Sequence, residues 1–180
     1  KKIYKENDLP NPTSIYGKTK YLAEELIKFN KNVLIIRLPI LFGPSNKNQI
    51  IDKLTKNLLN NKDVFASTDI FSTPVFTPYL CSFVYNEIIL KKKFLNKRIV
   101  HFTSNQYMSI YDLIKKISMK LNMNSKIKKV KDSHFKSKII KPKNLGLKSL
   151  YKHNKYLKDF NINELVPKIT LKNERTRKKI

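Results

Sequence analysis

The strongest constraint on the fold is a regular alternation of amphipathic helix patterns with short apolar strand patterns. Residues 33–38 form a nearly continuous apolar run, rich in β-branched side chains, which is typical of a strand covered on both faces. Such alternation predicts an α/β fold with parallel strands. Helices are predicted over 14–30, 48–60, 77–93 and 109–121, and strands over 33–38, 64–66 and 98–102.

Local signals predict where two of these helices begin and what joins the elements. Ser109 and Asp112 form a capping-box variant, and Thr77-Pro78 is expected to supply an N-cap and the first helical position. Residues 67–77 carry no sustained period and are expected to be an irregular connection. Cys81, on the helix that follows, is expected to be a small core residue.

Length and composition place the chain in a broad class. A chain of 180 residues with 41% hydrophobic residues suits one compact domain or part of a larger one. No apolar run approaches the roughly 20 residues of a membrane span and no signal peptide opens the chain, so we expect a cytoplasmic protein without a membrane partner. The chain begins at Lys1 without Met and has only three glycines, so we expect a fragment whose N-terminal part is missing.

Metal binding is not expected from the residue types present. A single Cys excludes an internal disulfide and any site built on several Cys ligands. His101, His134 and His153 are far apart and lack ligand spacing. His101 lies in a strand pattern and is expected to be a satisfied core residue.

The net charge of +25 would ordinarily indicate a nucleic-acid partner. However, 34 of the 38 basic residues are Lys, only four are Arg, and they are spread along the whole chain. Lys, Asn and Ile all have A/T-rich codons, so coding bias explains this mixture, whereas Arg is the residue suited to bidentate phosphate contacts. We therefore expect a lysine-dotted solvated surface and no nucleic acid; a nucleic-acid module, with steep salt dependence, is the rival reading.

Tyr16 and Lys20 have the clearest chemical potential. They are four residues apart at the start of a predicted helix, so their side chains share one face. An ammonium about 4 Å from a phenolate stabilises it by about 4 kcal/mol at an effective dielectric near 20, which would lower the Tyr pKa by up to roughly 3 units. Such a phenol can act as a general acid–base beside a carbonyl or alcohol. Taken alone, this spacing is more often a solvated helix pair.

Several motifs follow one another in an order that matches a known superfamily. They are Glu6-x-Asp8 with Pro12, Tyr16-Gly-x-x-Lys20 with Glu24, residues 37–43 (RLPILFG), Asp69 with Thr73-Pro74, and Lys141-Pro-x-Asn-x-x-Leu147. Together they resemble the C-terminal half of extended short-chain dehydrogenases/reductases. The nearest group is that of the dTDP-4-dehydrorhamnose reductases, and the resemblance runs from about Tyr4 to Leu150.

The resemblance implies the C-terminal portion of a Rossmann-type parallel sheet with a small substrate-binding lobe. Residues 1–66 and 78–102 would belong to the NAD(P)-binding Rossmann domain, residues 67–77 and 103–171 to the lobe, and residues 172–180 would be a basic tail. The complete protein would reduce a nucleotide-linked 4-keto sugar with NADP or NAD as its cofactor, and a homodimer is compatible with this family. The fragment would be inactive alone, because the Gly-rich phosphate loop would lie upstream.

The resemblance also implies roles for single residues. Tyr16 would be the catalytic acid–base, while Lys20 would lower its pKa and bind the nicotinamide ribose, so both would also contact the cofactor. The segment of Pro39, Ile40 and Leu41 would line the nicotinamide. The substrate-binding candidates are Phe42, Asn48, Lys141 and Asn144.

Three departures from the family pattern leave the sugar open. Ile40 stands where rhamnose-type reductases carry Trp, Lys141 where they usually carry Arg, and Ser72 where Gly is usual. One alternative is a nucleotide-sugar epimerase or dehydratase of the same superfamily. Another is a non-catalytic nucleotide-binding subunit, because residues 37–43 also resemble the regulatory β subunit of methionine adenosyltransferase.

Overall fold

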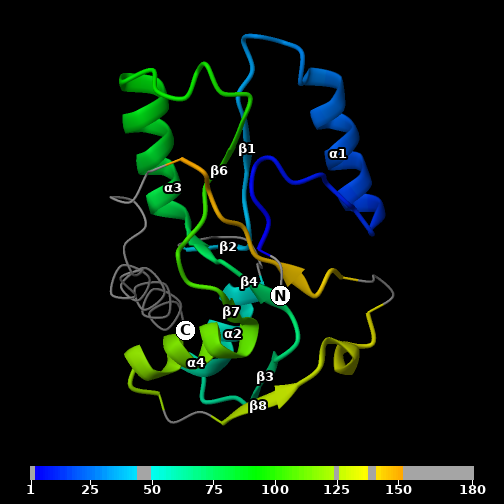
Figure 1. The fold of residues 1–180 in the computed structure, drawn as a ribbon. Helices are drawn as coiled ribbons and strands as arrows, with labels where there is room; N and C mark the ends of the chain where they lie inside the picture. Colours follow the sequence, from blue (N-terminus) through cyan, green and yellow to red (C-terminus); the bar gives the residue numbers. More distant parts are fainter. Residues whose placement is uncertain (1–2, 44–49, 124–125, 138–140, 152–180) are drawn as a thin grey trace, which may run out of the picture.

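The computed structural model describes residues 3–43, 50–123, 126–137 and 141–151 (Figure 1). The helices are α1 (Ile15–Ile27), α2 (Ile50–Leu59), α3 (Thr77–Phe83), the π-helix η1 (Val84–Leu90), α4 (Ile110–Lys120) and the 3-10 helix η2 (Asp132–Phe135). The strands are β1 (Ile35–Arg37), β2 (Leu41–Phe42), β3 (Val64–Ser67), β4 (Phe71–Ser72), β5 (Val75–Phe76), β6 (Ile99–His101), β7 (Met108–Ser109), β8 (Ile127–Val130) and β9 (Asn144–Leu145).

Parallel pairing of strands that are distant in sequence confirms the predicted α/β class. β1 pairs with β6, β2 with β5 and β3 with β8, all in parallel. A small mixed sheet has the order β7-β4-β9, in which β4 runs antiparallel to β7 and parallel to β9. The chain therefore combines Rossmann-like parallel pairs with a second, smaller assembly of strands.

The β1–β6 pair is covered on one side by α3 and η1. Phe83 and Phe102 are fully buried there, with ring centroids 4.6 Å apart in a stacked arrangement, and Val75 and Val100 complete the cluster. Figure 1 shows α1 on the other side of β1, set apart from it by the N-terminal loop. No residue of α1 is buried.

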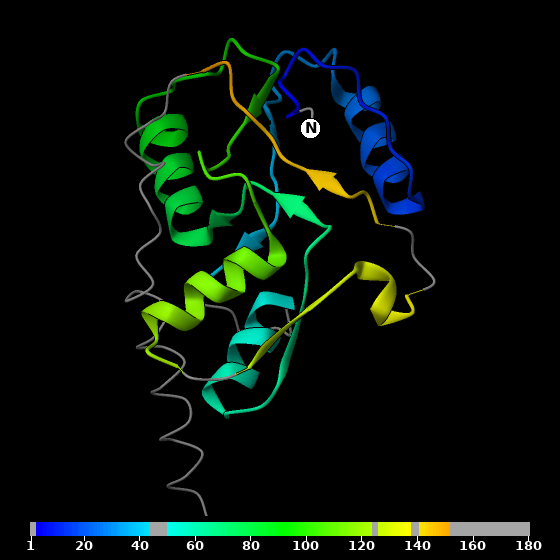
Figure 2. The ribbon, with the colours of Figure 1, turned by 60° about the horizontal axis from the view of Figure 1, so that its bottom comes forward.

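A second core packs α2, α4, β3 and β8 together, although we expected the first half of the chain up to residue 66 to belong to a different domain from α4 and β8. α2 lies beside α4 with β3 next to them (Figure 2), and the buried apolar residues of these elements form one cluster. We had placed residues 1–66 with the Rossmann domain, but α2 and β3 share the lobe core because β3 pairs with β8. The buried residues of this cluster include Ile51, Leu58, Val64, Ala66, Leu113, Ile114 and Ile117.

Three local expectations were wrong. The segment 67–77 is not irregular, because it contains β4 and β5, whose two-residue lengths leave no alternation in the sequence. Phe76, not Thr77, is the N-cap of α3, and Thr77 is its first residue. Cys81 is exposed instead of buried, because it lies on the face of α3 turned away from Phe83 and its cluster. The capping box at Ser109 is confirmed, with Asp112 N donating to Ser109 Oγ at 3.0 Å.

Gly43 lies at a close approach between β2 and the start of α3. Its φ is +153°, and a Cβ there would lie 2.1 Å from Thr77 Oγ1. We expect Gly43→Ala to lower the free energy of unfolding by roughly 2 kcal/mol, since backbone strain and a steric clash act together. Urea denaturation followed by circular dichroism measures this loss. Gly43→Ala in a Thr77→Ser background should be equally destabilised, because the clashing hydroxyl oxygen is still present. A Gly43→Ala variant as stable as the unsubstituted protein would contradict this close approach of Gly43 to Thr77.

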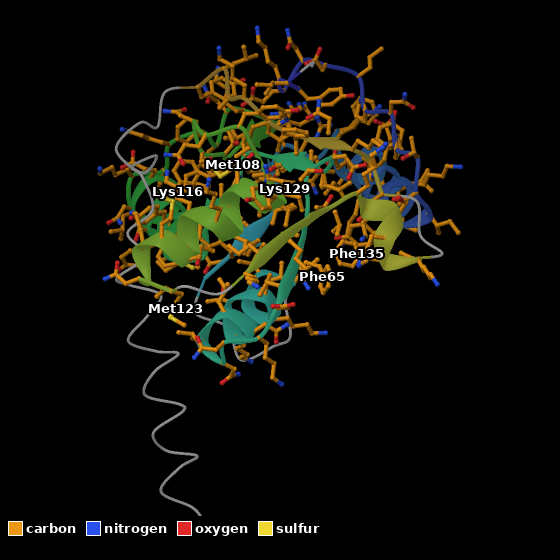
Figure 3. The ribbon with its side chains drawn as sticks, turned by 90° about the horizontal axis from the view of Figure 1, so that it is seen from below. Phe65, Met108, Lys116, Met123, Lys129 and Phe135 are labelled. Atoms are coloured by element: carbon orange, nitrogen blue, oxygen red, sulfur yellow. The ribbon has the colours of Figure 1, made fainter. Side chains whose placement is uncertain are left out.

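The basic side chains are distributed over the surface. Seen from below, nitrogen-tipped side chains surround the whole outline, with Lys116 and Lys129 in the middle of the lobe face (Figure 3). Several are already paired, such as Lys128 with Asp63 at 2.5 Å and Lys141 with Asp132 at 3.0 Å. Among the described residues, no helix is both long and apolar enough to cross a membrane.

Candidate functional site

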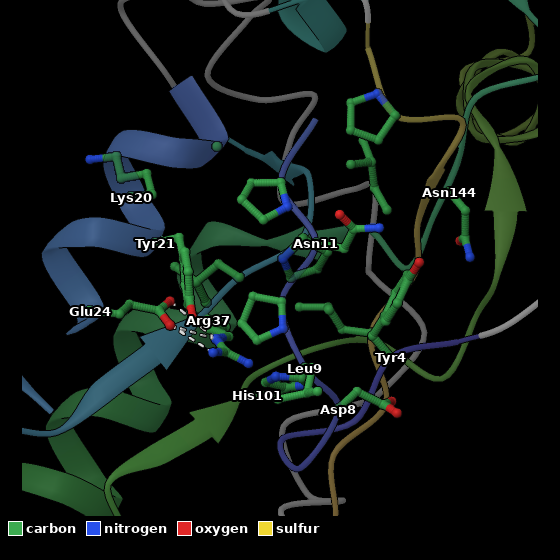
Figure 4. A pocket seen from close by; sticks show the side chains of 18 of the residues that line it. Tyr4, Asp8, Leu9, Asn11, Lys20, Tyr21, Glu24, Arg37, His101 and Asn144 are labelled. Atoms are coloured by element: carbon green, nitrogen blue, oxygen red, sulfur yellow. Dashed lines mark hydrogen bonds and ion pairs between the residues drawn. The ribbon is translucent and has the colours of Figure 1, made fainter. Parts of the chain in front are cut away.

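A cavity of about 520 Å³ opens between α1, the N-terminal loop, the carboxyl end of β1 and the lobe strand β9. It brings together five of the residues singled out in the sequence, namely Tyr16, Lys20, Pro39, Ile40 and Asn144. Figure 4 shows Lys20 on the α1 side of this cavity and Asn144 on the opposite side. Residues more than 120 positions apart thus face one space, at the sheet edge where ligands of open α/β sheets bind.

The first two turns of α1 carry Tyr16 and Lys20. Ser14 is the N-cap of this helix and accepts a hydrogen bond from Gly17 N at 3.1 Å. Lys20 Nζ lies 5.5 Å from the centroid of the Tyr16 ring, which is the contact expected of an i,i+4 pair. The Tyr16 side chain is 72% exposed, so its hydroxyl is open to the cavity and to solvent.

Gly17 allows the N-terminal loop to approach the first turn of α1. A Cβ on Gly17 would lie 3.1 Å from Pro12 Cβ and 3.2 Å from Ser14 Oγ, both tighter than ordinary contacts. The Gly that follows Tyr16 in the motif is therefore needed for packing.

An ion pair fixes α1 to β1 inside the same cavity. Arg37 Nη2 donates to Glu24 Oε2 at 2.6 Å, and Arg37 Nε lies 3.1 Å from both carboxylate oxygens (Figure 4). Both side chains are about one-fifth exposed, and the paired fork geometry is the strong form of this contact. Glu24 is four residues beyond Lys20, so Tyr16, Lys20 and Glu24 follow one helix face. Both charged residues belong to the motifs found in the sequence. The sequence analysis did not predict that they join α1 to β1.

The segment after β1 is held by backbone contacts to the lobe. Ile40 N donates to Ser72 Oγ at 3.3 Å, and Ile40 O accepts a hydrogen bond from Val75 N at 2.9 Å. Pro39 and Ile40 line the cavity as a stiff apolar wall. Leu41 turns away and packs with the cluster around Phe83, so it does not line the cavity.

The remaining substrate candidates are divided by the fold. Phe42 is fully buried in the lobe core and packs on Phe76 at 5.5 Å between ring centroids. Lys141 pairs with Asp132 and does not line the cavity, whereas its neighbour Pro142 does. Asn48 lies outside the described residues. Of this set, the cavity contains only Asn144 among the residues that the structure describes.

His101, which is buried and lines the cavity, is hydrogen-bonded to the half-buried Glu6. The Glu6 carboxylate accepts hydrogen bonds from His101 N at 2.9 Å, Ser149 Oγ at 2.7 Å and Leu150 N at 2.8 Å. His101 is 1% exposed, and its Nδ1 lies 3.2 Å from Lys148 O. Burial lowers the pKa of His101 below its usual value despite the Glu6 carboxylate nearby, so the ring is neutral at pH 7.

The expectation of a satisfied core histidine holds for only one ring nitrogen. Within the described part of the chain, His101 Nε2 has no hydrogen-bond partner. The described residues contain no cluster of acidic, His or Cys side chains suited to a metal ion. The lining of the cavity therefore combines a phenol, an ammonium, an amide and an apolar wall with the paired charges of Glu24 and Arg37 and the imidazole of His101.

A comparison with protein families decides the affiliation of the chain. Residues 1–164 match the family described as RmlD substrate binding domain. The chain belongs to this family. The resemblance to dTDP-4-dehydrorhamnose reductases that the motifs predicted is thereby confirmed.

Individual relatives of this RmlD-family chain point the same way. The spore coat polysaccharide biosynthesis protein SpsK of Bacillus subtilis (strain 168) is 26% identical over 140 residues, which cover 77% of this chain and 47% of that protein. Methionine adenosyltransferase 2 subunit beta of Danio rerio is 44% identical, but only over 45 residues, which are 24% of this chain and 14% of that protein.

Solved structures share the fold of the RmlD-family chain. The dTDP-4-dehydrorhamnose reductase from Yersinia enterocolitica has a TM-score of 0.76 at 24% identity, over 93% of this chain and 60% of that one. The reductase from Bacillus anthracis str. Ames in complex with NADP has a TM-score of 0.69 at 19% identity, over 93% and 59%. The chain therefore spans about half the length of SpsK and three-fifths of these reductases.

Proposed function

We propose that the complete protein carrying this chain reduces a nucleotide-linked 4-keto sugar with NADPH or NADH. One observation carries the proposal: Tyr16 and Lys20 line a single cavity together with Pro39 and Ile40 in a chain of the RmlD substrate-binding-domain family. A phenol beside an ammonium is a proton donor for a carbonyl that is becoming an alkoxide. The apolar wall suits the flat face of a nicotinamide ring.

The residues of this chain have separate roles in the proposed reaction. A bound nicotinamide dinucleotide supplies the hydride that the carbonyl carbon accepts. Tyr16 donates its phenolic proton to the carbonyl oxygen, so that the product is an alcohol and Tyr16 is left as phenolate. Lys20 stabilises that phenolate by its positive charge until solvent returns the proton. Arg37 and Glu24 keep α1 at a fixed distance from the Pro39–Ile40 wall.

The described residues fit the nicotinamide end of the cofactor better than its phosphates. The relative from Bacillus anthracis binds NADP, and a structure with UDP-glucose and NAD also shares the fold, so both nicotinamide cofactors stay in the proposal. Tyr16 is 72% exposed, and no Gly-rich phosphate loop lies within the described ranges. We therefore propose that the 180-residue chain has no turnover by itself and needs the rest of a Rossmann domain around this cavity.

A cofactor-oxidation assay tests the proposed reaction. We expect the complete protein to oxidise NADPH or NADH, followed at 340 nm, when dTDP-4-dehydrorhamnose or a related nucleotide-linked 4-keto sugar is added. The matched control is the same nucleotide with a 4-hydroxyl sugar, which has no carbonyl to reduce. Equal oxidation rates with both sugars, or no oxidation with any keto sugar, would contradict the proposal.

A second candidate is a nucleotide-binding regulatory subunit on the same fold. The observation in its favour is the 44% identity to methionine adenosyltransferase 2 subunit beta over 45 residues. This candidate requires cofactor or partner binding without turnover. Multiple turnovers in the assay above would exclude it, whereas cofactor binding with no turnover on any keto sugar would support it.

A further inference from the structure

Asn144 on β9 lines the same cavity as Tyr16 and Lys20, and its amide is held in one orientation. Gly146 N donates to Asn144 Oδ1 at 3.1 Å. A backbone N–H can only donate, so the side-chain atom that it meets must be the amide oxygen. Tyr107 OH also donates to Asn144 Oδ1, again at 3.1 Å. Since both donors contact the amide oxygen, the amide nitrogen is the end of the Asn144 side chain that is directed to other groups.

The position of Tyr107 is itself fixed by the small mixed sheet. β9 pairs in parallel with β4, which places Phe71 opposite Asn144. The Tyr107 ring stacks on Phe71 with centroids 5.4 Å apart and an interplanar angle of 16°. Side chains of paired residues project from the same face of a sheet, so stacking on Phe71 brings the phenol to Asn144.

Gly146 completes this arrangement from the other side. A Cβ on Gly146 would lie 2.6 Å from Tyr107 Cε2, so any larger residue would displace the ring. Burial raises the pKa of the Tyr107 phenol above its usual value, which keeps the proton on the oxygen and keeps it a donor. Phe71, Tyr107 and Gly146 thus hold the Asn144 amide in one position.

We propose that Tyr107 is a positioning residue that orients Asn144 to donate from its amide nitrogen to an acceptor oxygen of the nucleotide sugar. This inference rests on the proposed function. An amide nitrogen carries two N–H bonds, so it can donate to a substrate in addition to any protein acceptor. The acceptors that a nucleotide sugar offers are its ring oxygens, its hydroxyl oxygens and its diphosphate oxygens. Tyr107 reaches none of them itself, because its hydroxyl is engaged with Asn144.

The test replaces Tyr107 with Phe, which keeps the ring stacked on Phe71 and removes only the hydroxyl. We expect KM for the nucleotide sugar to rise three- to tenfold, the range for loss of one neutral hydrogen bond, while kcat stays within twofold. Tyr111→Phe is the matched control. It removes a hydroxyl from the same lobe, on α4, and should leave KM unchanged.

A double-mutant cycle separates positioning from general support of the fold. Asn144→Ala should raise KM more than Tyr107→Phe does, and Tyr107→Phe should add nothing further in the Asn144→Ala background. Asn144→Asp keeps both oxygen contacts but removes the N–H donor, so it should weaken binding at least as much as Asn144→Ala. The side-chain amide signals of Asn144 in a ¹⁵N spectrum should shift in Tyr107→Phe and stay in place in Tyr111→Phe.

Two results would overturn the inference while leaving the proposed function intact. One is a KM for Tyr107→Phe equal to that of Tyr111→Phe. The other is full additivity of Tyr107→Phe and Asn144→Ala, which would mean that Tyr107 acts on the fold and not through Asn144. Absence of both binding and turnover of any nucleotide sugar by the unsubstituted protein would contradict the proposed function, and this inference with it.

Discussion

Replacing Tyr16 with Phe is expected to lower the kcat of the complete protein by about 10²–10⁴-fold on a nucleotide-linked 4-keto sugar. The substitution removes the phenolic proton that we propose Tyr16 donates to a developing alkoxide. The ring is 72% exposed and the lost hydroxyl supports no core contact, so the free energy of unfolding should change by less than about 0.5 kcal/mol. KM for the sugar should change little, because the hydroxyl acts mainly in the transition state.

The measurement is a steady-state oxidation assay with matched variants. Tyr85→Phe is the control, because Tyr85 is also exposed but lies on η1, away from the cavity. Lys20→Met should also lower kcat, since the charge that stabilises the phenolate is gone. A Tyr16→Phe variant with undiminished kcat would remove Tyr16 from the reaction.

The sequence predicted the parts of this molecule that have a period or a motif. The parallel strand at residues 35–37, the helix that carries Tyr16 and Lys20, and the capping box at Ser109 all have local signatures of this kind. The carboxyl end of the strand also placed Pro39 and Ile40 at the site, because ligands collect at that edge of a parallel sheet.

The parts that could not be predicted depend on contacts between distant residues. Nothing in the sequence near Phe42 distinguishes a ligand contact from a core residue, and the fold makes it core by placing it on Phe76. The strands β4, β5, β7 and β9 are two residues long, so their pairing follows from the assembled lobe and not from any alternation. The packing of α2 and β3 with the later elements also depends on a distant partner. β3 pairs with β8, which lies more than 60 residues further along the chain.

Loss of the Glu6 carboxylate should strongly destabilise the fold. It joins the N-terminal loop to β6 and to the segment after β9, through His101 N, Ser149 Oγ and Leu150 N. Each hydrogen bond to a carboxylate is worth about 1.5–3 kcal/mol, and removing the acceptor leaves the donors unpaired. We expect Glu6→Ala to lower the free energy of unfolding by about 3–5 kcal/mol. Since small proteins are stable by only about 5–15 kcal/mol, this is a large share of the total.

Urea denaturation at pH 7 compares Glu6→Ala with Glu25→Ala. Glu25 is a carboxylate on α1 whose ion pair within the described part of the chain is with its helix neighbour Lys28, so its loss should cost less than about 0.5 kcal/mol. Glu6→Gln keeps the shape and an acceptor oxygen but not the charge, and should fall between the two. Similar losses for Glu6→Ala and Glu25→Ala would show that the Glu6 contacts contribute little.

The same carboxylate makes stability depend on pH. Burial by itself would raise the pKa of Glu6, but the hydrogen bonds from His101, Ser149 and Leu150 outweigh it, so the pKa in the folded state lies below 4.5. The unfolded chain then binds a proton more readily than the folded chain. The stability from Glu6 is therefore fully present above about pH 4.5 and is lost as the pH falls through the lower folded-state pKa. In Glu6→Gln this loss should be absent, so the wild-type and variant unfolding free energies should converge as the pH falls below 4.5. Parallel curves over that range would mean that the Glu6 carboxylate is not held by these donors.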